Sequence, residues 1–345
     1  MPVYVQLPAD LITPVMAYLR VSKDSRYSFL LESVLNGENI ARYSFIGAGA
    51  TRPLWFACPR SNYAIRSFQS RSDWSRDGYR RRPNGCSAKR AAGVQVRQNP
   101  RGPYLLWYAS TFLSHSFSIQ LQMVGGAIGY ISYDSIQYFE PRTRRPLKDP
   151  LGIPEAMFML CDTIIIYDHL HQTIQLVSHV FAPATVDKQS LSFAYSTAVA
   201  KARRTAKLVL SNTIPTTPQP PITLGATTTS NIGKEGYEAF VTSLKKNILA
   251  GDIIQAVPSQ RLSRPTALHP FNAYRQLRQV NPSPYMFYLD CGDIQLVGAS
   301  PETLCKVESS KVYNHAIAGT IRRGKTPAGS LFPTLSVATP FSNLY

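Results

Sequence analysis

The sequence predicts an α+β fold in which antiparallel sheets lie beside helices. One observation is a close succession of apolar, β-rich runs with tight turns near Gly292 and Ser309, which is typical of an antiparallel meander. A second is a pair of similar runs on either side of a polar turn near residue 170. The third is an amphipathic helical pattern before the meander. The meander runs occupy residues 284–291, 293–300, 302–307 and 311–319, and the earlier pair occupies 154–169 and 172–181.

Four elements are expected before residue 50. Residues 2–8 predict a short strand and residues 10–20 a short helix. Residues 27–33 and 42–48 predict two strands with buried faces, joined by a turn at Asn36-Gly37, a dipeptide that favours turns.

Between residues 124 and 231 the pattern predicts a strand, a long helix and a linker. Small residues lead into a strand at 127–132. Residues 187–212 predict a surface helix, because apolar residues recur at helical intervals with lysines and arginines among them. Residues 214–231 are rich in proline and threonine and poor in core-forming side chains, so they predict a linker.

The amphipathic helix near residue 240 is the clearest in the chain, and Gly251 suits its end. Residues 252–257 then predict a strand, and a short helix is expected at 271–279. The apolar face of the first helix consists of Tyr237, Phe240, Val241, Leu244 and Ile248.

The positive charge is concentrated in one segment. The chain carries 37 basic and 20 acidic residues, for a formal net charge of +17, and such a balance ordinarily indicates an anionic partner such as nucleic acid. Residues 51–123, however, hold twelve of the basic residues and two of the acidic ones. No period of 3.6 or 2 persists there, so this Arg-rich insert is expected to be disordered, and a nucleic-acid partner is not expected.

The remaining composition indicates a reducing compartment. Five cysteines form no CxxC pair and no cluster with histidine, so neither a disulfide framework nor a zinc site is indicated, and no residue is assigned as a metal ligand. The first residues lack a signal-peptide pattern. The uncharged run 102–123 is interrupted by polar side chains, so no membrane partner is expected. A cytoplasmic protein is expected.

Four motifs and one long block identify a family. The motifs are Leu30-Leu31-Glu32-Ser33, Asn281-Pro282-Ser283-Pro284-Tyr285-Met286-Phe287, Gly298-Ala299-Ser300-Pro301-Glu302 and Ala318-Gly319-Thr320, and the block is residues 231–264. Together they closely resemble component I of anthranilate synthase, the large chorismate-utilising subunit of tryptophan biosynthesis. The resemblance implies a β-sandwich flanked by helices, as in chorismate-utilising enzymes, with the C-terminal part missing.

The resemblance divides the chain into six parts. They are an N-terminal region at 1–50, the Arg-rich insert at 51–123, the remainder of the N-terminal domain at 124–213, the linker at 214–231, a partial chorismate-binding domain at 232–327 and an atypical tail at 328–345. The abrupt changes of composition at residues 51 and 328 suggest translation through an intron or in a shifted frame.

Two catalytic positions are implied by the resemblance. In the family, ammonia from a glutamine amidotransferase partner attacks carbon 2 of chorismate as the carbon 4 hydroxyl leaves, and pyruvate is then eliminated to give anthranilate. A hydroxyl leaves readily only when protonated, and Glu302 matches the glutamate that relatives use as the general acid. The alternative is an ordinary exposed turn glutamate. Gln255 lies where water-using relatives carry a lysine that activates water; ammonia needs no such base, so glutamine favours the ammonia-using branch.

Chorismate-binding positions are implied at Gly319 and Thr320. A residue without a side chain lets the backbone approach an anionic ligand, and a hydroxyl donates a hydrogen bond. A simple strand-end turn is the alternative. Ala318 separates the chain from aminodeoxychorismate synthases, which place a lysine there.

An inhibitory site for tryptophan is also implied, with Ser33, Pro284, Tyr285 and Met286 as the matching residues and Glu32 nearby. An indole needs an apolar slot, and its ammonium group needs a polar or anionic end. Core packing is the alternative for Tyr285 and Met286.

Several family features have no counterpart. The magnesium-binding glutamates, the catalytic histidine and the residues that hold the chorismate carboxylates follow residue 327 in the family pattern, and none is matched before Tyr345. Magnesium offsets the charge of the substrate carboxylate, so impaired activity is expected. Ala316 and Ile321 stand where relatives usually have proline and arginine.

Two other functions stay open. A non-catalytic regulatory subunit would keep a surface for tryptophan or for the amidotransferase, and it would bind tryptophan without turnover. An RNA-binding function of the Arg-rich insert would use Trp55, Phe56, Trp74 and Tyr79 to stack on bases and arginines to neutralise phosphates.

Overall fold

A computed structural model describes residues 1–33, 42–49, 52–57, 64–67, 125–146, 148–181, 187–308 and 311–314. The chain forms two compact units. Unit 1 comprises Met1–Thr217 and Ala273–Ala299, and unit 2 comprises Pro218–Asn272 and the chain from Ser300. The division after Thr217 lies within the Pro/Thr-rich stretch, whereas residues 273–299 belong with the N-terminal part of the chain.

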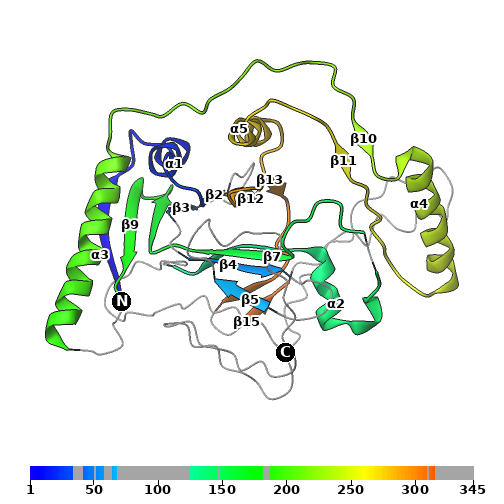
Figure 1. The fold of residues 1–345 in the computed structure, drawn as a ribbon, viewed down its shortest axis with the longest axis horizontal. Helices are drawn as coiled ribbons and strands as arrows, with labels where there is room; N and C mark the ends of the chain where they lie inside the picture. Colours follow the sequence, from blue (N-terminus) through cyan, green and yellow to red (C-terminus); the bar gives the residue numbers. More distant parts are fainter. Residues whose placement is uncertain are drawn as a thin grey trace, which may run out of the picture. The chain divides into compact units, whose positions relative to one another are not determined.

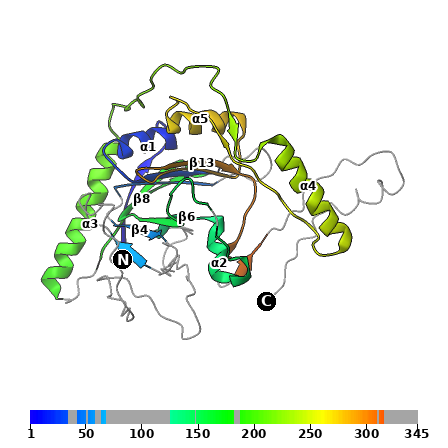
Figure 2. The same cartoon turned by 45° about the vertical axis from the view of Figure 1, so that its right-hand side comes forward.

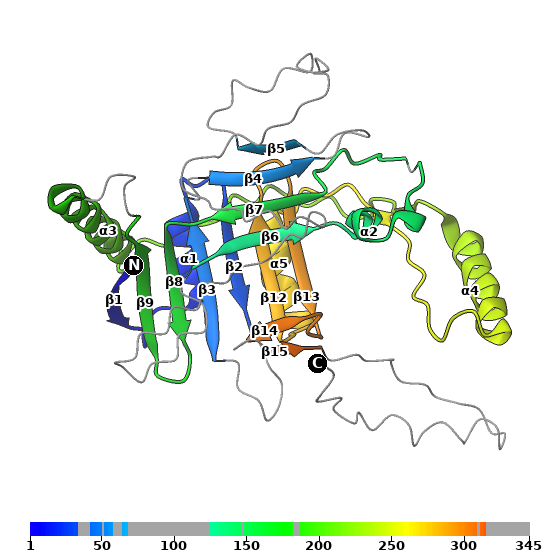
Figure 3. The same ribbon diagram turned by 90° about the horizontal axis from the view of Figure 1, so that it is seen from below.

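Unit 1 is built on a seven-stranded sheet (Figures 1 and 3). The pairs from β1 to β12 are all antiparallel. The strands expected near residues 2–8, 27–33, 42–48 and 284–300 are thereby confirmed, and the turn expected at Asn36-Gly37 lies outside the described residues. In spatial order the strands are β1 (Pro2–Pro8), β9 (Thr173–His179), β8 (Thr163–Asp168), β3 (Tyr43–Ala48), β2 (Ser28–Glu32), β12 (Tyr285–Asp290) and β13 (Gln295–Ser300).

The register aligns apolar side chains in rows across this sheet. Leu30 lies opposite Ile46, and Ile46 lies opposite Ile165. Leu176 continues the row on β9, and all four side chains are buried. Successive side chains of a strand point to opposite faces, so Phe29 faces the other side, where it is also buried. Both faces of the sheet are covered at its central strands, which explains why β2, β8 and β9 read as apolar runs, whereas the edge strand β1 alternates between exposed and half-buried residues.

A second, four-stranded sheet covers one face. Its strands lie in the order β5 (Ala64–Ser67), β4 (Arg52–Ala57), β7 (Ala156–Leu160) and β6 (Ala127–Ile131). The two sheets share one hydrophobic cluster, in which Met157 and Met159 of β7 lie with Phe29, Ile164 and Leu289 of the larger sheet. Figure 2 shows β4 and β6 on the side of the larger sheet opposite α1.

Two sequence-based expectations fail in this part of the fold. The run 154–169 is expected as one stretch of strand but forms two strands, because the chain passes from the smaller to the larger sheet at Cys161-Asp162. Residues 52–57 and 64–67 lie in the insert for which no regular structure is expected, yet they form β4 and β5. The reason is tertiary, because 52–57 finds a ready partner in the buried strand β7.

Helices cover the other face of the larger sheet. The α1 helix (Pro14–Ser22) begins after Thr13, whose hydroxyl accepts a hydrogen bond from the Met16 amide, and it contacts β2 and β3. The α3 helix (Lys188–Val209) begins after Asp187 and packs a buried alanine stripe against β1 and β9 (Figure 1). Both confirm predicted helices. After β6, the chain forms the short helical turns η2 (Tyr133–Ser135), α2 (Ile136–Phe139) and η3 (Pro141–Thr143).

Unit 2 holds α4 (Gly233–Ala250) and two short strand pairs. The pairs are β10 (Thr229–Ser230) with β11 (Leu262–Ser263), and β14 (Lys306–Glu308) with β15 (Lys311–Tyr313). Gly251 ends α4 with a φ of 84°, as the sequence predicts. The strand predicted at 252–257 is wrong: no strand of the described residues pairs with it, and Ile254 is 97% exposed.

The remaining helix, α5 (Pro270–Val280), confirms the short helix expected at 271–279, and its residues from Ala273 onward belong to unit 1. Within the described part of the chain, no helix has the length and apolar character needed to cross a bilayer.

Candidate functional site

The pairing of β2 with β12 brings together residues from the two ends of unit 1. Its register places Met286 opposite Glu32. Ser33 follows Glu32 directly, and Pro284 and Tyr285 come just before Met286. Two strands far apart in sequence therefore gather the residues predicted to bind tryptophan.

These residues do not all face the same way. Met286 and Glu32 are 1% and 3% exposed and lie on the side of the sheet that the helices cover. Tyr285 points to the opposite face, since neighbouring side chains in a strand alternate, and it is 45% exposed. The pairing thus places an apolar and an acidic side chain together, with Tyr285 on the other side.

The Glu32 carboxylate is held by α5. The Tyr274 hydroxyl donates a hydrogen bond of 2.6 Å to Glu32 Oε2. The Arg278 Nε atom lies 3.1 Å from the same oxygen. Tyr274 and Arg278 are four residues apart, so they project from one face of the helix. Among the described residues, no donor or cation contacts the other carboxylate oxygen, Oε1.

Opposing effects set the charge of this carboxyl group. Burial raises the pKa of Glu32, whereas the positive charge of Arg278 and the hydrogen bond from Tyr274 lower it. Burial, followed by the nearby Glu32 charge, raises the pKa of Tyr274, so this hydroxyl keeps its proton and donates. Arg278 is therefore the group that favours the ionised form of Glu32 most strongly.

A second polar pair lies beside Glu32 on the next strand. Ser44 stands opposite Glu32 in the β2–β3 register and is fully buried. Its Oγ atom lies 2.8 Å from His169 Nε2. Burial and the Arg278 charge lower the pKa of His169, so its ring is neutral near pH 7. Among the described residues next to Glu32, Arg278 is therefore the charged partner, whereas Ser44 and His169 are neutral.

The residues predicted to carry the chemistry belong to unit 2. Gln255 is exposed in the irregular segment after α4. Glu302 is half-buried just after β13, and the Ser300 hydroxyl donates to the backbone carbonyl of Glu302 at 3.3 Å. Gly319 and Thr320 lie outside the described residues.

Comparison with known proteins gives the context of these residues. Residues 70–331, most of the chain, match the family model described as chorismate binding enzyme. The chain belongs to the chorismate-binding enzyme family. It is 43% identical over 325 residues to "Probable anthranilate synthase component 1" of Schizosaccharomyces pombe, covering 94% of this chain and 58% of that protein. It is also 43% identical over 332 residues to "Anthranilate synthase component 1" of Saccharomyces cerevisiae, with the same two coverages.

A solved structure shares the mixed helix and antiparallel-sheet fold. It is the crystal structure of anthranilate synthase component I from Streptococcus pneumoniae TIGR4, with a TM-score of 0.50 and 21% identity, covering 89% of this chain and 60% of that chain. The chain spans 58% of the length of the two fungal relatives.

The magnesium implied by the family resemblance has no match among the described donors. Within the described ranges, no group of three or more His, Cys, Asp or Glu side chains is placed to hold a metal ion. The described residues therefore do not fit a metal centre, and no step proposed below passes through one.

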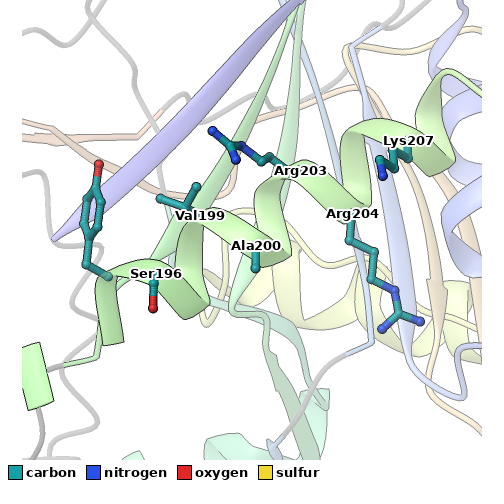
Figure 4. A pocket seen from close by; sticks show the side chains of 7 residues that line it. Ser196, Val199, Ala200, Arg203, Arg204 and Lys207 are labelled. Atoms are coloured by element: carbon teal, nitrogen blue, oxygen red, sulfur yellow. The ribbon is translucent and has the colours of Figure 1, made fainter. Parts of the chain in front are cut away.

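A surface hollow of about 560 Å³ lies on α3, and none of the predicted site residues lines it (Figure 4). Its lining includes Val199 and Ala200 as the apolar part and Arg203, Arg204 and Lys207 as the basic part. A stripe of basic side chains on one surface helix is typical of a helix face that contacts solvent.

Sequence reasoning missed Tyr274 and Arg278, although the sequence holds a signal for them. A glutamate at the end of an apolar strand needs a partner when it is buried. Residues 271–279 carry a tyrosine and an arginine at helical spacing just before the motif that begins at Asn281. What the sequence could not show is that α5 packs over the end of β2.

Proposed function

We propose that this chain is the large, chorismate-utilising subunit of anthranilate synthase. It would convert chorismate and ammonia to anthranilate and pyruvate. The observation that carries the proposal is 43% identity, across 94% of the chain, to two fungal proteins that bear that name. Gln255 supports the ammonia-using branch of the family, because ammonia needs no lysine to activate it.

In the proposed reaction, Glu302 is the general acid. Its carboxyl proton passes to the carbon 4 oxygen of chorismate, which leaves as water while the ammonia lone pair forms the bond to carbon 2. Loss of the carbon 2 proton and of pyruvate then completes the aromatic ring. Gly319 and Thr320 would bind the substrate through backbone and hydroxyl groups.

The finer parts of the proposal concern partners and context. Ammonia would come from a glutamine amidotransferase, and tryptophan would inhibit by binding at Ser33, Pro284, Tyr285 and Met286. The two sheets of unit 1 would be the β-sandwich of chorismate-utilising enzymes, supported by their shared hydrophobic cluster. A cytoplasmic location is supported by the cysteines among the described residues, which are all free.

The test is anthranilate fluorescence from chorismate and an ammonium salt, with the Glu302→Gln variant as a matched control. Glutamine keeps the size of the side chain and removes the transferable proton. Formation of anthranilate by the chain, reduced at least a hundredfold in the variant, supports the proposal. Equal rates in both proteins would exclude Glu302 as the acid.

A second candidate is a non-catalytic subunit that binds tryptophan. The clustering of Glu32 and Met286 within unit 1 favours it, since this site does not depend on the unit that holds Glu302. Saturable tryptophan binding without anthranilate formation would select this candidate. Absence of both binding and turnover would reject the two candidates together.

A further inference from the structure

We propose that Tyr274 and Arg278 of α5 are positioning residues of the tryptophan site: they hold Glu32 through Oε2, so that Oε1 is presented to the ammonium group of an amino-acid ligand. The inference rests on the proposed function, because it takes tryptophan as the ligand of this site. It adds residues of a helix outside the motifs that indicated the site.

The contacts at the two oxygens are unequal. Oε2 accepts the 2.6 Å hydrogen bond from Tyr274 and lies 3.1 Å from Arg278 Nε. No donor or cation of the described residues contacts Oε1. An ionised carboxylate has acceptor capacity on both oxygens, so Oε1 keeps the capacity that an ammonium group would use.

The surroundings of Glu32 suit a ligand with one apolar and one cationic end. Met286 stands directly opposite Glu32 and is buried, which supplies apolar surface next to the carboxylate. Ser44, on the other neighbouring strand, is engaged with His169. Ligand selectivity would therefore depend on the charge of Glu32.

The helix α5, whose side chains hold Glu32, is followed in the chain by β12, the strand that carries Met286. The Asn281 amide donates a hydrogen bond of 2.8 Å to the Leu277 carbonyl, and this bond closes the end of α5. Three residues separate Asn281 from Tyr285, the first residue of β12. The contacts to Glu32 thus fix the position of α5 relative to β2, and with it the start of the strand that carries Met286.

Arg278 also matters for the charge of the carboxylate. Burial raises the pKa of Glu32, and Arg278 is the largest opposing influence. Within the described ranges, the charged and titratable groups that face Glu32 are Arg278 and Tyr274 from α5 and, by way of Ser44, His169 at the end of β8. Without Arg278 the carboxyl group would hold its proton to higher pH and attract an ammonium group less.

The experiment compares two ligands by titration calorimetry on the full chain. L-Tryptophan carries the ammonium group, whereas indole-3-propionate has the same ring and carboxylate without it. The ratio of their dissociation constants reports the ammonium contact alone. The variants are Arg278→Gln, Tyr274→Phe and the charge-conserving Arg278→Lys, and the matched control is Arg275→Gln, which removes a charge from an exposed position of the same helix.

Tyr274→Phe removes one charge-assisted hydrogen bond to Glu32 and is expected to reduce the preference for tryptophan over indole-3-propionate by about tenfold. Arg278→Gln removes the ion-pair partner of Glu32 and is expected to reduce the preference by a similar factor. Arg278→Lys and Arg275→Gln should keep it within about twofold. Equal weakening of both ligands, or an unchanged ratio, would overturn the positioning role while leaving the tryptophan site intact. No tryptophan binding by the unmodified chain would reject the regulatory part of the proposed function, and the inference with it.

Discussion

Replacing Arg278 with methionine tests how Glu32 is stabilised. Methionine keeps most of the apolar stem and removes the charge, which leaves a buried carboxylate with Tyr274 as its remaining partner. Breaking a fully buried ion pair costs about 3–5 kcal/mol. The Arg278 side chain is 39% exposed, so water screens the pair, and we expect a loss of about 1–2 kcal/mol in the free energy of unfolding at pH 7.5.

The loss should depend on pH in a definite direction. Burial raises the pKa of Glu32 above its ordinary value of 4.5, so the folded state binds more protons than the unfolded state, and stability falls as pH rises through this window. Arg278 lowers that pKa, so removing it moves the folded-state value further up and widens the window. The variant should therefore match the unmodified chain near pH 4, where Glu32 is protonated in both, and fall behind it as pH rises.

Urea unfolding followed by circular dichroism between about pH 4 and pH 8 measures this difference. Arg275→Gln serves as the control for loss of a surface charge from α5. A stability difference that stays constant across the pH range would show that Arg278 stabilises the fold by packing alone, contrary to this expectation. A difference in the free energy of unfolding that shrinks as pH rises would also contradict this expectation.

Three further substitutions test other contacts by the same unfolding measurement. Tyr274→Phe removes the hydrogen bond to Glu32 and should cost about 1.5–3 kcal/mol; a neutral effect would show that the bond is unimportant. Gly129→Ala places a methyl group against the backbone carbonyl of Met157 and should cost about 1–3 kcal/mol, whereas a stabilising effect would mean that β6 and β7 are not paired as described. Gly251→Ala forces a side chain onto a φ of 84° and should cost about 1 kcal/mol, and unchanged stability would argue against the left-handed end of α4.

Local patterns predicted much of the fold. The apolar face and glycine stop of α4 and the turn at Gly292, with a φ of 85°, follow from residue preferences that act over a few positions. The alanine stripe of α3 likewise marks a helix that packs one face on a sheet. Three of the four motifs that revealed the family, at 30–33, 281–287 and 298–302, lie in such regular segments or at their ends.

Elements that depend on distant partners could not be predicted. The run 154–169 divides between two sheets, and nothing local marks Cys161 as the crossing point. Residues 252–257 have the composition of a strand but no partner strand among the described residues, so they do not form one. Residues 52–57 show the opposite case, because pairing with β7 makes a strand within an aperiodic segment.

The candidate site was predicted unevenly for the same reason. Ser33 and Met286 were identified from short sequence motifs. The strand register places Met286 opposite Glu32, the residue before Ser33. The partners of Glu32 on α5 required the packing of a helix over a strand more than two hundred positions away in the chain. A buried charge in a strand sequence is thus a signal that a partner exists, without indicating where.

The most direct test of the tryptophan site is a crystal structure of this chain with L-tryptophan. We expect the ligand's ammonium nitrogen within hydrogen-bond distance of Glu32 Oε1 and the indole against Met286. Tyr274 and Arg278 should still contact Oε2. A ligand bound elsewhere, or one whose ammonium group displaces Arg278 from Glu32, would contradict this arrangement.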